Sequence, residues 1–289
     1  MHGSADNEKR VFWAMVLTGG FMVVEVAGGI FTGSLALLAD GGHMLTDTAA
    51  LALAWVAFRI GRRSPDSRRS YGYHRFQVLA AFVNGVTLIA IVGWILIEAV
   101  RRLVAPIEVL GGTMLVVATA GLVVNVVAFV ILHGGDRENL NIPGAALHVL
   151  GDLLGSVAAI VAAGIILWSG WMPIDPLLSL FVAMLIARSA WVLIRKSAHI
   201  LLEGTPDWLD VAALRAELTE AVPDVEDIHH VHAWSLTVER PLMTLHAKVR
   251  HGADYGETLK AITRFLEATC GISHATVQLE PGRCPDEPQ

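Results

Sequence analysis

Two short stretches of the sequence place a histidine and an aspartate at the same spacing. Residues 43–47 and 148–152 both have the pattern His-x-Leu-x-Asp. Residues four apart in a helix lie on one face, about one turn from each other, so each pair presents an imidazole beside a carboxylate. Two such helices facing each other would offer two nitrogen and two oxygen ligands, which suits tetrahedral Zn²⁺. The pairs His43/Asp47 and His148/Asp152 therefore predict a metal site built from two helices.

The ligand types narrow the choice of metal without fixing it. Thiolates are absent from both stretches, which disfavours Cu(I), and imidazoles disfavour Mg²⁺ and Ca²⁺. Co²⁺, Ni²⁺ and Fe²⁺ stay open, because these ligands also suit them. One such histidine or aspartate alone would be explained equally well by a hydrogen bond to a neighbouring helix, but two matched pairs favour metal. Asp40 has two open interpretations: an acceptor that orients the His43 imidazole, or a residue at the mouth of a cavity.

The segments that carry these pairs are long and apolar. The chain of 289 residues is 54% hydrophobic and 17% charged, with a mean hydropathy of +0.56, which argues against a wholly soluble protein. Six runs have about the 20 apolar residues that a helix needs to cross a bilayer. The predicted spans are 11–31, 35–60, 76–100, 110–132, 143–168 and 174–194. The two His/Asp pairs lie in the second and fifth of them, and an ionisable group at membrane depth is a functional candidate by default.

The short connections between the spans differ in basic residues. Lysines and arginines crowd the segment before the first span, the second and fourth connections and the segment after the sixth. Basic residues favour the cytoplasmic side, so both termini are predicted to be cytoplasmic. The first span is too long for a cleavable signal peptide and contains Glu25.

A soluble pattern begins at residue 203. Residues 203–289, the tail, hold 7 Lys and Arg against 15 Asp and Glu, a net charge of −8. Hydrophobic periodicity predicts a helix at 207–221, strands at 225–236 and 242–249, a helix at 255–269 and a strand at 274–280. The predicted fold is thus an α-helical membrane domain of six transmembrane helices, residues 1–202, followed by a small α+β (αββαβ) domain, residues 203–289, with its helices on one face of the sheet.

Several classes of function are disfavoured. Neither half has the basic stripe that nucleic acid requires. The sequence contains neither His-Glu-x-x-His nor Gly-x-Ser-x-Gly, and four side chains would close the metal site, so an enzyme is not expected. A channel is disfavoured because a saturated site binds too tightly for rapid conduction. A transporter and a metal sensor both remain open on these grounds.

Four stretches, together with the six spans and the tail, resemble the cation diffusion facilitator family, specifically its zinc-transporting branch. They are residues 34–40 (Ser-Leu-Ala-Leu-Leu-Ala-Asp), 71–75 (Tyr-Gly-Tyr-His-Arg), 147–155 and 229–236 (His-His-Val-His-Ala-Trp-Ser-Leu). The resemblance implies a homodimeric antiporter that exports Zn²⁺ from the cytoplasm in exchange for protons. The expected location is the plasma membrane, which is the inner membrane in a bacterium, and an organelle membrane stays open for a eukaryote. The resemblance also implies that His43, Asp47, His148 and Asp152 form the transport site, the imidazoles serving as proton carriers.

The resemblance extends to the tail and to the connection before the third span. It implies a regulatory cytoplasmic zinc site at His229, His246 and Glu280, with His274 and Cys284 as further candidates. It implies a charge pair between Arg75 and Glu203. In the connection it points to Asp66 and His74, but Tyr73 stands where a second histidine is expected, so a weak or absent metal site is predicted there.

Strand alternation gives one further expectation for the first tail strand. It predicts that His230 and His232 share one face while His229 takes the other. His232 and Trp234 are expected to help pack the sheet.

Overall fold

The structure is a computed structural model that describes residues 2–45, 48, 66–133 and 141–282, and the backbone alone at 2–15, 129, 132–133 and 141–152. It divides into two compact units. Unit 1 comprises Met1–Val56 and Ala80–Ile194, and unit 2 comprises Ala57–Leu79 and Arg195–Gln289.

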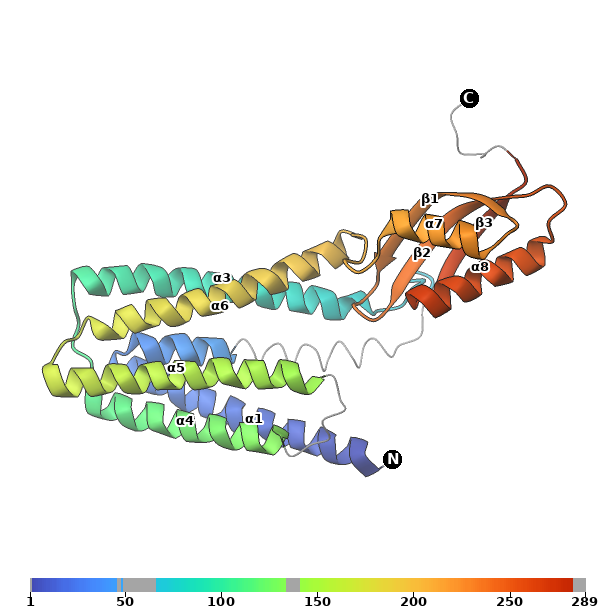
Figure 1. The fold of residues 1–289 in the computed structure, drawn as a ribbon. Helices are drawn as coiled ribbons and strands as arrows, with labels where there is room; N and C mark the ends of the chain where they lie inside the picture. The colour runs from blue at the N-terminus through green and yellow to red at the C-terminus, as the bar shows by residue number, and fades with distance from the viewer. Residues whose placement is uncertain (1, 46–47, 49–65, 134–140, 283–289) are drawn as a thin grey trace. The chain divides into compact units, whose positions relative to one another are not determined.

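Unit 1 is built from long helices that lie side by side (Figure 1). The helices are α1 (His2–Thr32), a helix at Leu35–Leu45, α3 (Arg75–Val104), α4 (Gly111–His133), α5 (Asn141–Ser169) and α6 (Ile174–Leu201). Within the described residues, three helical stretches are long and apolar enough to cross a membrane: α3, Gly111–Ala128 of α4, and α6. Val16–Thr32, Leu35–Leu45 and Leu153–Ser169 are shorter apolar helices. A membrane domain of apolar helices is thus observed, and the number six stays a prediction.

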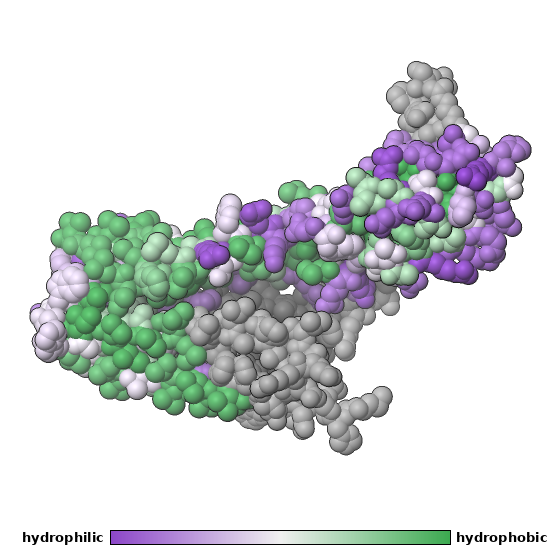
Figure 2. Space-filling view, viewed as in Figure 1, coloured by the Kyte–Doolittle hydropathy of each residue, from purple (hydrophilic) through white to green (hydrophobic). Residues whose placement is uncertain are grey.

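The helix Leu35–Leu45 packs on both of its sides. Leu35 and Ala39 join an apolar cluster with α3 and α6, whereas Ala36 and Leu37 join another with α4 and α5. Gly41 lets α1 approach closely, because a Cβ there would lie 2.8 Å from a methyl carbon of Val26. On the face seen in Figure 2, the described surface of the helices is largely hydrophobic. Such a surface suits lipid rather than water.

Unit 2 contains a three-stranded sheet with strand order β1-β2-β3. Its elements are α7 (Val211–Ala221), β1 (Val225–Ser235), β2 (Pro241–Val249), α8 (Tyr255–Cys270) and β3 (His274–Glu280). The first two strands are antiparallel and the last two are parallel. Leucines and isoleucines of α7 and α8 pack with one face of the sheet, so both helices cover that face. The predicted αββαβ order is confirmed; α7 begins four residues later than predicted, because Asp210 caps it at the backbone N–H groups of Ala212 and Ala213.

The predicted alternation of the β1 histidines is wrong. The register between β1 and β2 shifts twice, once between Val225 and Asp227 and again between His229 and His232. In the second shift two residues of β1 stand opposite one residue of β2, a β-bulge, and His230 has a positive φ of 47°. His230 therefore lies beside His229 instead of opposite to it, with ring centroids 5.4 Å apart.

Candidate functional site

A cluster of two histidines and a glutamate occupies the sheet face that α7 and α8 leave uncovered. On β2, Leu245 and Ala247 belong to the core under the helices, so His246 between them points to the opposite face. On β3, Leu279 packs against the same core, which sends Glu280 to the face of His246. His229 is paired with His246 across the two strands. Three strands thus bring one side chain each to the same place.

The distances in this cluster suit a metal ion. His229 Nε2 lies 3.1 Å from Glu280 Oε2, and His246 Nδ1 lies 2.9 Å from Glu280 Oε1. One ligand atom from each residue falls within 4.8 Å of the others, and Glu280 is only 2% exposed. Because imidazole nitrogen and carboxylate oxygen are ligands of Zn²⁺, small side-chain shifts would allow all three to bind one ion.

Neighbouring side chains orient these ligands. Asp227 Oδ2 lies 3.2 Å from His229 Nδ1, and an N–H on that nitrogen leaves Nε2 free to bind a metal beside Glu280. The Gln278 amide donates a hydrogen bond of 3.0 Å to Glu280 Oε1. Such supporting contacts fix the tautomer and the direction of a metal ligand.

A third histidine, His230, also lies at this cluster and was not predicted from the sequence. The bulge brings its ring to 4.9 Å from the ring of His246, centroid to centroid. The run His-His-Val-His does not predict a bulge, because each of its residues fits a regular strand equally well.

Of the two remaining tail candidates, the structure describes His274, which lies away from the cluster. His274 begins β3, six residues from Glu280, which places it about 20 Å along the strand from the cluster. Its ring stacks edge-on against Tyr71, with centroids 6.1 Å apart. Cys284 lies outside the described residues. His232 is exposed instead of packing the sheet, whereas Trp234 is half-buried.

The structure describes the membrane candidates in part. His43 is half-buried on the helix Leu35–Leu45. Asp47 lies outside the described residues. His148 and Asp152 lie on α5, where the structure describes the backbone and not their side chains. Of the four predicted ligands, His43 alone thus has a described side chain, and the positions of His148 and Asp152 along α5 are given by its backbone.

A polar contact joins the two helices close to these candidates. Asp40, which is 1% exposed, accepts a hydrogen bond of 3.4 Å from the Ser156 hydroxyl on α5. The amide of Asn125 on α4 donates in turn to Ser156 Oγ at 3.3 Å. Gly155 lies directly against the Asp40 side chain, since a Cβ there would be 2.6 Å from the Asp40 Cγ. Of the two interpretations of Asp40, its burial between helices disfavours the mouth of a cavity.

The connection before α3 holds Asp66 and His74 in contacts that do not involve a metal. Asp66 accepts hydrogen bonds from the Tyr73 hydroxyl at 2.7 Å and from the backbone of Arg68 and Arg69 at 2.8 Å each. These bonds, that of Tyr73 first, lower the pKa of Asp66. Tyr73, which stands where a second histidine was expected, thus binds the Asp66 carboxylate through its hydroxyl.

His74 is engaged by the tail. Arg240 Nη1 lies 2.7 Å from His74 Nε2, and because a guanidinium can only donate, that nitrogen must be the acceptor. Burial, followed by the charge of Arg240, lowers the pKa of His74. The expected charge pair is also present: Arg75 Nη2 lies 2.9 Å from Glu203 Oε1.

Comparison with known proteins identifies the family. The cation efflux transmembrane domain matches residues 11–202, and the cytoplasmic domain of cation efflux proteins matches residues 206–282. The chain belongs to the cation diffusion facilitator family. The resemblance noted from the sequence is thereby confirmed, and this facilitator is a multi-pass membrane transporter of cations and not an enzyme.

Its relatives are named for metals. The facilitator is 52% identical to the zinc transporter ZitB of Pectobacterium atrosepticum over 287 residues, covering 99% of this chain and 89% of the relative. It is 49% identical to ZitB of Escherichia coli over 280 residues, covering 96% and 89%. It is 40% identical to the cadmium, cobalt and zinc/H(+)-K(+) antiporter of Bacillus subtilis over 284 residues, covering 96% and 91%.

Proposed function

We propose that this protein exports Zn²⁺ from the cytoplasm by exchange for protons, through a site formed by His43, Asp47, His148 and Asp152. The two most similar relatives described above are named zinc transporters, and the Bacillus subtilis relative is named a cadmium, cobalt and zinc/H(+)-K(+) antiporter. The transported ion is the substrate of the site and not a resident cofactor. Six membrane spans with both termini in the cytoplasm, in the inner membrane of a bacterium, complete the proposal.

The main support for the transport site is the alignment of the two helices that hold its residues, Leu35–Leu45 and α5. Ala36 and Leu37 share an apolar cluster with α5 residues between Ala159 and Ile166, whereas Asp40, further along its helix, contacts the earlier Ser156, so we infer that the two helices are antiparallel. His43 is three residues beyond Asp40, and Asp152 is four residues before Ser156. At 1.5 Å per residue these positions lie about 4.5 and 6 Å from the Asp40–Ser156 contact, in the same direction.

The same register serves the other pair. On α5, His148 lies eight residues before Ser156, one turn beyond Asp152, and in the sequence Asp47 follows His43 by four residues. His43, His148 and Asp152 thus fall within two adjacent turns of a pair of helices joined by Asp40 and Ser156, and the His-x-Leu-x-Asp spacing makes Asp47 the proposed fourth ligand. A site of two imidazoles and two carboxylates at this level can hold Zn²⁺ tetrahedrally.

Proton exchange follows from the ligand chemistry. A neutral imidazole binds a metal and a protonated one does not, so protons entering from the far side would displace the ion. No separate relay is then required. The acidic tail, with its net charge of −8, would raise the cation concentration at the cytoplasmic entrance.

For the tail we propose a regulatory zinc site and a homodimer. His229, His246 and Glu280 would hold the ion, and their short distances and shared face support this assignment. The match to the cytoplasmic domain of cation efflux proteins supports association through the tail. Asp66 and His74 are proposed to bind no metal, since Tyr73 and Arg240 engage them.

Zinc flux in proteoliposomes tests the transport function. The purified protein is expected to move Zn²⁺ when a pH gradient is imposed, and the initial rate should fall when a protonophore collapses that gradient. Protein-free liposomes with the same gradient serve as the control. Binding of Zn²⁺ by folded, inserted protein without any flux would identify a metal sensor instead.

Removing a tail ligand should change zinc stoichiometry but leave transport intact. Replacing His246 by alanine is expected to reduce bound Zn²⁺ by one ion per chain, because it removes one of the three side chains proposed to hold the ion. His251→Ala, which alters an exposed histidine in a turn outside the cluster, is the matched control. Stoichiometry is measured by elemental analysis after gel filtration. Equal zinc content in the two variants would remove His246 from the site.

A further inference from the structure

Three connections of unit 1 meet at a buried carboxylate at the start of α6. Asp175 is 0% exposed. Its Oδ1 accepts a hydrogen bond of 2.6 Å from the Ser34 hydroxyl and one of 3.2 Å from the Ala36 N–H, and its Oδ2 accepts one of 2.7 Å from the Leu35 N–H. The first N–H groups of a helix have no partner within the helix. Asp175 therefore caps the helix Leu35–Leu45 from a position 140 residues away in the sequence.

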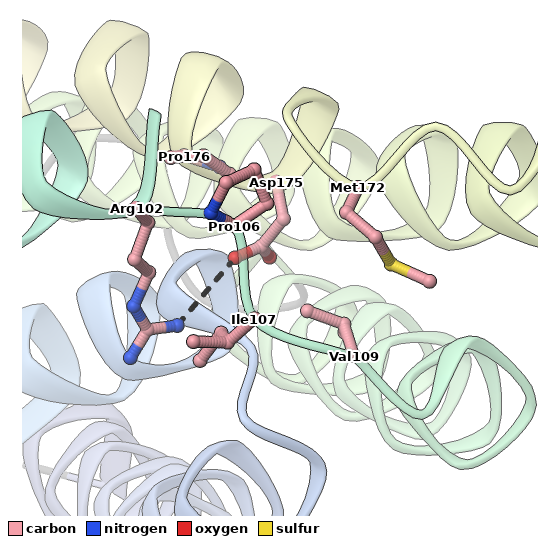
Figure 3. Close-up of a pocket in the computed structure, with 7 residues that line it drawn as sticks. All are labelled: Arg102, Pro106, Ile107, Val109, Met172, Asp175 and Pro176. Carbon is pink, nitrogen blue, oxygen red and sulfur yellow. Dashed lines mark ion pairs between the residues drawn. The ribbon is translucent and has the colours of Figure 1, made fainter. Parts of the chain in front are cut away.

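The end of α3 completes this arrangement. Arg102 Nη1 lies 4.0 Å from Asp175 Oδ2, as the dashed line in Figure 3 marks, and the same nitrogen donates to the backbone carbonyl of Gly33. Arg102 Nε binds Glu98 at 3.0 Å. The backbone N–H of Leu110 donates to Thr32 O at 3.0 Å, which attaches the connection after α3 to the same turn.

The surroundings of the pair are dry. Pro106, Ile107, Val109, Met172 and Pro176 line the hollow beside Arg102 and Asp175 (Figure 3), which has no room for a water molecule. A carboxylate and a guanidinium in such a place depend on each other and on the helix N–H groups for stabilisation. Any movement that separates Leu35–Leu45 from α6 at this end would leave the buried Asp175 carboxylate without the hydrogen bonds from Ser34, Leu35 and Ala36.

We propose that Asp175 is a positioning residue of the transport cycle, which fixes the start of the helix Leu35–Leu45 and thereby the height and rotation of His43. This inference rests on the proposed transport site. A helix advances 1.5 Å and turns 100° for each residue, so a fixed first turn determines where a residue nine positions later lies. The helix can then pivot about its capped end but cannot slide along α6.

The test compares two variants of Asp175 with a matched control on the same helix. Asp175→Ala removes the cap, and Asp175→Asn keeps one acceptor oxygen but loses the charge. Ser179→Ala is the control, because the Ser179 hydroxyl donates to the backbone carbonyl of Asp175, at 2.7 Å, and not to its carboxylate, so its loss leaves the cap in place. Zinc flux in proteoliposomes is measured against zinc concentration, alongside zinc binding to the purified full chain and hydrogen exchange of the peptide covering residues 33–45.

In Asp175→Ala the maximal flux should fall about tenfold or more, while the zinc concentration at half-maximal flux changes little. The reason is that misplaced ligands still bind Zn²⁺ but no longer release it efficiently during the transport cycle. Exchange in the peptide should rise in Asp175→Ala, rise less in Asp175→Asn, and stay unchanged in Ser179→Ala. A merely structural role would lower the yield and zinc binding together without this separation.

Two results would overturn the proposal. One is wild-type maximal flux in both Asp175 variants, and the other is unchanged peptide exchange in them. If Asp175→Ala does not fold, the same two measurements on Asp175→Asn decide the matter. His43→Ala is run in parallel: flux retained in that variant would refute the transport site itself, whereas flux lost there but unaffected by Asp175 substitutions would refute the positioning role alone.

Discussion

Zinc flux should disappear when His148 or Asp152 is replaced by alanine. Each change removes one of four ligands, and three remaining ligands neither saturate tetrahedral Zn²⁺ nor compete well with water for it. Even altering a residue that only supports a metal ligand typically costs about 10 to 100-fold in affinity or activity, so the loss of a ligand itself should be larger. Initial rates in proteoliposomes under an imposed pH gradient measure the effect.

The controls for this prediction separate ligand loss from misfolding. His251→Ala removes an exposed tail histidine and should transport at the wild-type rate. Asp152→Asn preserves size and one oxygen but removes the charge, and it should fold like the wild type while transporting poorly. Wild-type flux in Asp152→Ala, with protein content in the vesicles matched, would show that the transported ion does not use this residue.

A single added methyl group at Gly155 should have the second largest effect. Because a Cβ at this position would overlap the Asp40 carboxylate, the Asp40 side chain or α5 itself must move. Overpacking of this kind typically costs about 1–3 kcal/mol of stability. Gly155→Ala is therefore expected to lower the melting temperature in detergent and to reduce zinc flux, since displacing Asp40 disturbs the contact that aligns the helices.

Gly164 provides a matched control on the same helix. A Cβ at Gly164 would meet no atom within 4 Å, so Gly164→Ala should leave the melting temperature and flux unchanged or slightly raise stability through helix propensity. Equal melting temperatures and rates for the two alanine variants would mean that the close approach of Gly155 to Asp40 does not constrain the protein.

The order of elements could be predicted from local patterns. Apolar runs marked the helices of unit 1, and the period of the tail residues predicted αββαβ with boundaries within a few residues of those observed. The cluster residues of the tail came from the family resemblance, and the structure brings His229, His246 and Glu280 together because regular alternation on β2 and β3 places two of them on one face.

What the sequence could not predict depends on contacts between distant residues. Asp175 begins a helix in the sequence, where it fits a surface position or a cap of its own helix equally well. Its role as cap of another helix requires knowing that residues 34 and 175 meet. Ser34 after Gly33 resembles a local helix cap, and the Ser34 hydroxyl does accept the Leu37 N–H at 3.2 Å, which conceals the more distant partner.

The bulge at His230 gives the tail an unusual freedom in evolution. Deleting this one residue would turn β1 into a regular strand at that point, yet His229 could remain opposite His246 and His232 opposite Thr244. The apolar core beneath α7 and α8 would be untouched. A lineage could therefore gain or lose the third imidazole through the insertion or deletion of one codon, without redesigning the domain that displays it.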